Sequence, residues 1–198
     1  MDDRLRVVNA GGNVAVAVDP RRDQLRSLLA GRRQHPVDDR EAASVLAFSD
    51  ALARLERPFD QDADPTHVTS SAIVTGAPGV ILLRHKRLGI WVQPGGHLEP
   101  GEDLAGGAWR EAEEETGLAL EHPEDGPVMV HVDVHPGGRG HIHLDLRWWL
   151  LGRGQPAPPA GESQEVAWLG WDEAIRRADA GLSGALRALR QRGGAARA

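Results

Sequence analysis

The segment from Gly96 to Leu118 constrains the fold of this chain more than any other stretch; it reads GHLEPGEDLAGGAWREAEEETGL. Its second half predicts a helix over about Asp103 to Thr116. Asp103 is a good N-cap residue, and Gly117 stands where a left-handed residue often ends a helix. Three carboxylates occur at i, i+3 and i+4, so the spacing places them on one face of this helix. They belong to Glu111, Glu114 and Glu115.

Three like charges on one face oppose helix formation. Each pair at this spacing costs roughly 0.2–0.5 kcal/mol. Gly106 and Gly107 in the first turns each cost about 1 kcal/mol relative to alanine. A helix that serves only as scaffold has little reason to carry both penalties. A bound Mg²⁺ would make the cluster favourable, because this ion takes oxygen ligands and pairs them with substrate phosphates. The alternative is a solvated acidic face without a ligand.

The whole segment resembles the Nudix box, G-x5-E-x7-R-E-U-x-E-E-x-G-U, in which U is a bulky aliphatic residue. Ala112 is small for its U position, whereas Trp91 and the Pro94-Gly95-Gly96 turn before the box also resemble family members. The resemblance covers about Thr66 to Asp179. The matching positions are Gly96, Glu102, Arg110, Glu111, Glu114, Glu115, Gly117 and Leu118.

The resemblance implies a metal-dependent hydrolase, with Mg²⁺ as the cofactor and Mn²⁺ as an alternative. Arg110 is expected to orient Glu111 and to pair with Glu102, while Gly96 and Gly117 have structural roles in the motif. Metal ions would neutralise a diphosphate, help to ionise a water molecule and stabilise the leaving oxygen. The implied metal ligands are Glu111, Glu114, Glu115 and the carbonyl oxygen of Gly95.

One carboxylate must accept the proton of the attacking water. Glu111 and Glu114 are the leading candidates. In the family the base can also come from a downstream loop or strand, so Glu165, directly before a predicted strand, is a further candidate, ahead of Glu162. The alternative for Glu165 is a surface charge at the edge of a strand. The predicted catalytic residues are therefore Glu111, Glu114, Arg110 and Glu165.

A second group of polar residues lies on two predicted strands, Val128 to His135 and His141 to Leu151, joined by the turn Pro136 to Gly140. Polar and apolar residues alternate, so the polar ones share a face of each strand. They are His131, Asp133, His135, His141, His143 and Asp145. This face is solvated, lines the substrate or holds a transition metal. The candidate substrate-binding residues, whose side chains can hold phosphate or sugar oxygens, are His97, His131, His143 and Arg139.

The rest of the chain predicts an α/β fold with a helical extension in front. Helices are expected at about Asp19 to Ala30 and Asp38 to Glu56; the second has an apolar stripe that includes Ala43 and Leu46. Phe59 to Thr66 reads as a linker. We therefore divide the chain into an extension, residues 1–65, and a Nudix domain with C-terminal helices, residues 66–198. Interleaved strands and helices predict a Nudix-type α/β/α sandwich with a mixed sheet. The remaining expected strands are 68–74, 80–83, 89–92 and 166–169, and the closing helices are 171–179 and 182–190.

Composition excludes several classes of function. The chain has 198 residues, a net charge of −6 and no cysteine. We therefore expect no nucleic-acid partner, no thiolate metal site and no cysteine nucleophile. The charged segment Met1 to Arg6 is not followed by a long apolar run, so we expect no signal peptide, no membrane partner and a cytoplasmic location.

These features predict a hydrolase of a nucleoside diphosphate derivative, converting NDP-X to NMP and P-X, or NTP to NMP and pyrophosphate. The alternative is a non-catalytic Nudix-like module that binds a nucleotide. Isopentenyl diphosphate isomerase shares the fold but relies on a cysteine, which argues against it here. ADP-ribose-like compounds, nucleotide sugars and damaged nucleoside triphosphates all remain open as substrates. The extension could cap the pocket, form a homodimer interface or be inert.

Overall fold

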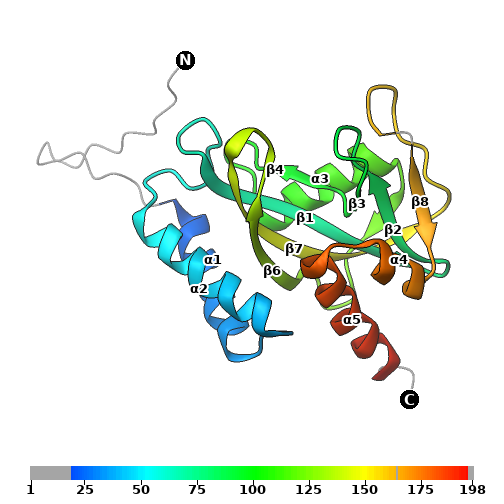
Figure 1. The fold of residues 1–198 in the computed structure, drawn as a ribbon, viewed down its shortest axis with the longest axis horizontal. Helices are drawn as coiled ribbons and strands as arrows, with labels where there is room; N and C mark the ends of the chain where they lie inside the picture. The colour runs from blue at the N-terminus through cyan, green and yellow to red at the C-terminus, as the bar shows by residue number, and fades with distance from the viewer. Residues whose placement is uncertain (1–18, 164, 196–198) are drawn as a thin grey trace, which may run out of the picture.

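The computed structural model describes residues 19–163 and 165–195, so the charged segment Met1 to Arg6 lies outside the described residues. Within these ranges, a mixed sheet of eight strands has helices on both faces and beside one edge (Figure 1). One hydrophobic cluster joins Ala72 of the sheet to Ala108 on one face, and a second joins Ile73 to Leu186 on the other. The predicted α/β/α sandwich is confirmed.

Two long parallel strands, β1 (Thr66–Gly76) and β7 (Ile142–Arg153), form the centre of the sheet. β1 also pairs with β2 and β4, β7 pairs with β5 and β6, and β2 pairs with β3 and β8; all these pairs are antiparallel. The other strands are β2 (Gly79–Arg84), β3 (Trp91–Val92), β4 (Gly95–His97), β5 (Ala119–Glu121), β6 (Val128–Pro136) and β8 (Val166–Leu169).

Each predicted helix is present, with small changes at its ends. They are α1 (Pro20–Gln34), α2 (Asp39–Arg54), α3 (Leu104–Thr116), α4 (Trp171–Arg177) and α5 (Ala180–Ala195). The predicted apolar stripe of α2 was wrong at two positions: Ala43 is exposed, and Leu46 is 48% exposed. The buried face of α2 instead includes the polar residues Glu41 and Ser44.

Two strand predictions also need correction. The expected turn at Gly95-Gly96 is strand β4, which runs so close to β1 that a Cβ added to Gly95 would lie 2.3 Å from the Cβ of Ser71. The glycines therefore permit a close approach between two strands. Strand β5 was not predicted, because three residues are too few to show a strand-like alternation.

The helical extension packs directly on the sheet. Leu25 of α1 and Phe48 of α2 belong to the same hydrophobic cluster as Val132 and Leu144. Two polar side chains of α2 bind the outer edge of β6: the backbone N–H of Val132 donates to Glu41 (2.8 Å), and that of Val134 donates to Ser44 (3.2 Å). Glu41 is held in turn by Arg32 of α1. The predicted division between residues 65 and 66 thus crosses a continuous hydrophobic core.

None of the described helices combines the length and the apolar character that crossing a lipid bilayer requires.

Candidate active site

Arg110 organises the carboxylates of α3. Its Nη1 donates to Glu111 (2.9 Å) and to Glu114 (3.1 Å), while its Nε donates to Glu102 (2.9 Å). Its Nη2 donates to the backbone carbonyl of His97 on β4 (2.9 Å). The expected pairing of Arg110 with both Glu102 and Glu111 is confirmed. The hydrogen bond to Glu102 raises the pKa of Arg110, and although burial opposes it, this pairing lowers the pKa of Glu102.

Glycines let the segments of the motif approach one another. A Cβ added to Gly96 would lie 2.4 Å from the carboxylate of Glu111, and one added to Gly107 would lie 2.4 Å from Leu98. Gly107 is therefore required for packing, because a larger side chain there would collide with Leu98. Gly117 adopts the predicted left-handed conformation (φ 64°) and ends α3 against the backbone of Ala157.

The carboxylates of α3 outnumber the positive charge beside them, because Arg110 pairs with Glu111 and Glu114 as well as with Glu102. Burial raises the pKa of Glu115 to about 7, although its Oε2 accepts a hydrogen bond from the backbone N–H of Gly95 (2.9 Å). The negative charges of Glu111 and Glu162 add to this shift. Burial also raises the pKa of Glu111, even though Arg110 opposes it. A cation beside these groups would favour their ionised forms.

The residues around α3 fit a hard divalent cation. Glu111, Glu114 and Glu115 offer carboxylate oxygens, the ligand type that Mg²⁺ prefers. Gly95, the fourth predicted ligand, lies next to Glu115, because its N–H contacts that carboxylate. The half-exposed side chain of Glu114 leaves one side of this group open to solvent.

The two downstream carboxylates differ in their surroundings. Glu165 is exposed and forms an ion pair with Arg84 of β2 (3.1 Å). Glu162, which the sequence ranked lower, lies close enough to Glu115 to raise the pKa of that residue. The loop before β8 therefore brings Glu162 into electrostatic contact with the candidate metal ligands.

The predicted polar face of the β6–β7 hairpin is present, and β1 extends it. The register places Asp133 opposite Asp145, and His135 opposite His143. We call this surface the polar sheet face. It consists of His131, Asp133 and His135 of β6, His143, Asp145 and Arg147 of β7, and His67, Thr69 and Ser71 of β1.

Arg147 neutralises the carboxylates of the polar sheet face. It contacts Asp133 (3.1 Å) and Asp145 (3.2 Å), and all three side chains are almost fully buried. Asp145 also accepts hydrogen bonds from the hydroxyl groups of Thr69 (3.1 Å) and Ser71 (2.8 Å). These carboxylates are fully engaged within the protein.

The predicted substrate-binding residues fall in three environments. His131 is fully buried, and its Nδ1 lies 3.3 Å from a guanidinium nitrogen of Arg147, which favours a structural role over the predicted contact with substrate. Burial lowers its pKa to about 3. Arg139 is exposed at the tip of the hairpin, with φ 59°. His97 and His143 are half-buried, and burial lowers the pKa of both, to about 4 for His143.

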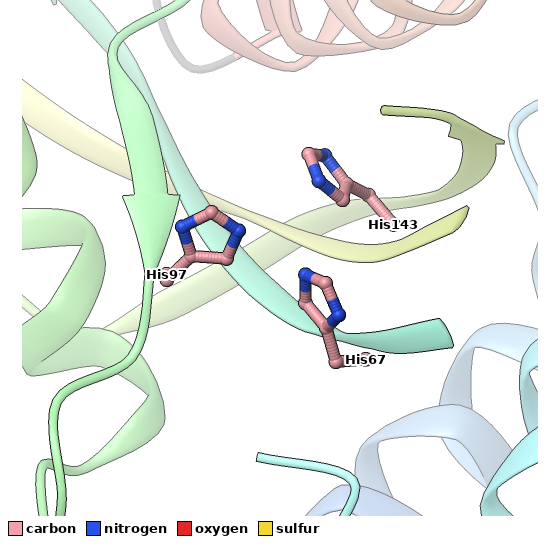
Figure 2. A group of neighbouring side chains, drawn as sticks. All are labelled: His67, His97 and His143. Atoms are coloured by element: carbon pink, nitrogen blue, oxygen red, sulfur yellow. The ribbon is translucent and has the colours of Figure 1, made fainter. Parts of the chain in front are cut away.

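His97 and His143 meet at a third histidine, His67 of β1, which sequence reasoning missed (Figure 2). The ring centroid of His67 lies 4.9 Å from that of His97 and 5.3 Å from that of His143. His67 could have been found from its alternation with Thr69 and Ser71 along β1, because alternate residues of a strand place their side chains on one face.

The chain belongs to the NUDIX domain family, whose model matches residues 65–189. This range contains Arg110 and the candidate metal ligands Gly95, Glu111, Glu114 and Glu115, which we call the α3 site. It leaves helices α1 and α2 outside.

Two named relatives are similar to this chain in sequence. The m7GpppN-mRNA hydrolase NUDT17 of Bos taurus is 32% identical over 97 residues, which cover 42% of this chain and 32% of the relative. The Uncharacterized Nudix hydrolase YvcI of Bacillus subtilis is 44% identical over 72 residues, covering 36% and 42%. The aligned part of this chain thus spans less than half of either relative.

Solved structures share the fold. A NUDIX-family hydrolase from Clostridium perfringens has a TM-score of 0.54 and 24% identity, covering 63% of this chain and 97% of that one. An Ap4A hydrolase binary complex from C. elegans has a TM-score of 0.56 and 22% identity, covering 65% and 98%. The likeness concerns the architecture of the sandwich.

Proposed function

We propose that this chain is a Mg²⁺-dependent hydrolase that cleaves the diphosphate linkage of a nucleoside diphosphate derivative. It would convert NDP-X to NMP and P-X, or NTP to NMP and pyrophosphate. The observation that carries the proposal is the group of three carboxylates on α3, with Glu111 and Glu114 held by Arg110 and Glu115 held by Gly95. Mn²⁺ is the alternative ion, since it also accepts carboxylate ligands.

We assign the following roles to the side chains around α3. Glu111, Glu114 and Glu115, with the carbonyl of Gly95, would hold the ion, which neutralises the diphosphate and makes water easier to ionise. Arg110 keeps Glu111 in place.

Identifying the general base requires a comparison of variants. Glu111 and Glu114 remain the leading candidates, and Glu162 joins them because of its proximity to Glu115. Loss of a general base lowers turnover by about 10²–10⁴-fold. We expect Glu162→Gln to lower kcat if Glu162 is the base, whereas Glu165→Gln is the matched control within the same loop. A larger loss of kcat in Glu165→Gln than in Glu162→Gln would identify Glu165 as the general base instead.

The proposed substrate contacts are His97, His143 and Arg139. The names of two similar proteins refer to an mRNA cap, m7GpppN, and to Ap4A, so dinucleoside polyphosphates join the candidate substrates. A library should contain these together with ADP-ribose-like compounds, nucleotide sugars and nucleoside triphosphates. Identification of the products by chromatography would reveal which bond breaks.

The decisive test replaces the proposed ligands one at a time. Glu114→Gln and Glu115→Gln should each fold normally and lose at least about a thousandfold in Mg²⁺-dependent turnover, because each loss removes a ligand of the ion that stabilises the developing charge. Glu113→Gln is the matched control, since Glu113 is exposed on the same helix and occupies a variable position of the motif. Near wild-type turnover by both variants would contradict the proposal. Nucleotide binding by the wild type without product would support the alternative, a non-catalytic binding module.

A further inference from the structure

We propose that His67, His97 and His143 form a binding site for a transition-metal ion of the Zn²⁺ type, separate from the carboxylates of α3. The three imidazoles come from three strands, β1, β4 and β7, and converge on one point (Figure 2). One ring nitrogen from each residue lies within 4.8 Å of the corresponding nitrogens of the other two.

The spacing of these nitrogens is close to that of a metal centre. Zn²⁺ binds imidazole nitrogen at about 2.0–2.1 Å in a tetrahedral arrangement, so its nitrogen ligands lie about 3.4 Å apart. The three nitrogens therefore need to approach by at most about 1.4 Å, the difference between that spacing and the observed limit of 4.8 Å. Rotation of the side chains about their own bonds can supply this movement.

His67 is oriented as a ligand. Its Nδ1 lies 3.1 Å from the backbone carbonyl of Asp64, which can only accept, so Nδ1 carries the hydrogen and Nε2 keeps its lone pair. The residue is fully buried, and Nε2 has no hydrogen-bond partner. A buried polar atom without a partner destabilises the folded protein. A histidine bound to metal commonly donates its other ring N–H to a carbonyl in this way.

The two other rings are also held in position. The Nε2 atom of His97 is buried without a partner, so it has an unused ligand position. Gly137 of the hairpin lies against His143, where an added Cβ would be 2.3 Å from the ring. His141 flanks His67 edge-on, and His135 flanks His143, with centroids 5.1 Å and 5.5 Å away.

The donors of this site select a different ion from those of α3. Imidazole nitrogen suits Zn²⁺, Co²⁺ or Ni²⁺, whereas Mg²⁺ prefers oxygen. The nearby carboxylates Asp133 and Asp145 are already paired with Arg147. Three protein ligands would leave a fourth position for water or a substrate oxygen.

An ion at this site would also stiffen the candidate active site. His97 uses its side chain for the site and its backbone carbonyl to accept a hydrogen bond from Arg110. A bound ion would join β4 to β1 and β7 and thereby fix the strand that leads to α3. We expect the protein to unfold at a higher temperature when the ion is bound.

The test measures metal binding by the full-length, untagged chain after removal of metals with a chelator. Co²⁺ is the probe, because its visible absorption reports tetrahedral nitrogen coordination, and Zn²⁺ should displace it at one equivalent. His67→Ala and His143→Ala should each weaken Co²⁺ binding by at least about 100-fold. His35→Ala, an exposed histidine at the end of α1, and Glu115→Gln should bind Co²⁺ like the wild type.

Further variants keep the test valid if the buried His67→Ala chain does not fold. His97→Gln changes a half-buried residue, and Gly137→Ala should displace the ring of His143, so both should weaken binding in a folded protein. Binding that persists in His97→Gln and His143→Ala would overturn the proposal. Loss of the Co²⁺ signal in Glu115→Gln alone would place the ion on α3 and would also overturn it. Neither result bears on Mg²⁺-dependent hydrolysis, which is measured separately.

Discussion

The carboxylates of α3 and the polar sheet face are both rich in acidic groups, but they differ in how charge is balanced. On the polar sheet face, Asp133 and Asp145 are paired with Arg147, and Asp133 also contacts Arg40. At α3, Glu111 and Glu114 of the helix and Glu102, which precedes it, share the guanidinium of Arg110, and Glu115 adds a further negative group. The carboxylates of the polar sheet face thus have matching counter-charges within the protein, whereas those of the proposed metal site carry an excess of negative charge.

Replacing one charge in each region would test this comparison most severely. Arg147→Met removes the counter-charge that two buried carboxylates share and leaves only Arg40 beside Asp133, so it should lower the free energy of unfolding by about 3–5 kcal/mol. Glu114→Gln removes one of several like charges and should change it by less than about 0.5 kcal/mol. Urea denaturation in metal-free buffer measures both. Equal effects in the two variants would show that the regions do not differ in charge balance.

Gly96→Ala should separate the geometry of the α3 site from its charge. The added methyl group would meet the carboxylate of Glu111 and shift it, so we expect turnover to fall by about 100-fold while every charge remains. Gly31→Ala is the control, because this helical glycine faces open space. The control should keep full activity and gain about 0.5–1 kcal/mol in stability. Full activity in Gly96→Ala would mean that the position of Glu111 is unimportant.

The pH dependence of stability should reveal the buried imidazole of the polar sheet face. Burial and Arg147 lower the pKa of His131 to about 3, whereas the unfolded value is about 6.5. Between these values the unfolded chain binds a proton that the folded chain does not. The free energy of unfolding should therefore decrease as the pH falls, by up to about 1.4 kcal/mol per pH unit from this group.

His131→Gln should remove that contribution, so the difference between wild type and variant should shrink as the pH falls from 6.5 to 4. The lowered pKa of Asp133 also makes stability decrease in acid, but this residue is common to both chains. His35→Gln, which changes an exposed histidine, should leave the wild-type profile. A pH-independent difference would mean that His131 titrates normally in the folded protein.

The smallest effect is expected for the ion pair between Arg84 and Glu165. Both side chains are largely exposed, at 46% and 62%, so the pair should contribute less than about 1 kcal/mol. A double-mutant cycle with Arg84→Met and Glu165→Gln measures it. A coupling comparable to the effect of Arg147→Met would show that burial does not determine the strength of these pairs.

The α3 site could be predicted in detail because its residues are close in sequence. Asp103 and Gly117 define the ends of one helix, and the spacing of the glutamates defines one of its faces. The contacts of Arg110 with Glu102 and Glu111 were expected from the resemblance to the Nudix box, and both are present.

The environment of the polar sheet face could be predicted only in part. Alternation along β6 and β7 indicated which side chains share a face, but not that β1 lies parallel to β7 and brings His67 beside His143. The sequence also did not indicate that Arg147 pairs with Asp133 and Asp145, because these contacts depend on how strands distant in sequence pair with one another. The close approach of β4 to β1 was missed for this reason too.

The contact of α2 with β6 has a consequence for how the protein can be shortened. Glu41 and Ser44 satisfy backbone N–H groups of β6 that would otherwise point outward from the sheet. A chain trimmed to the family's own boundaries, without its first two helices, would present that strand as a template on which another molecule could add a strand. We therefore expect the trimmed chain to self-associate more readily than the full chain.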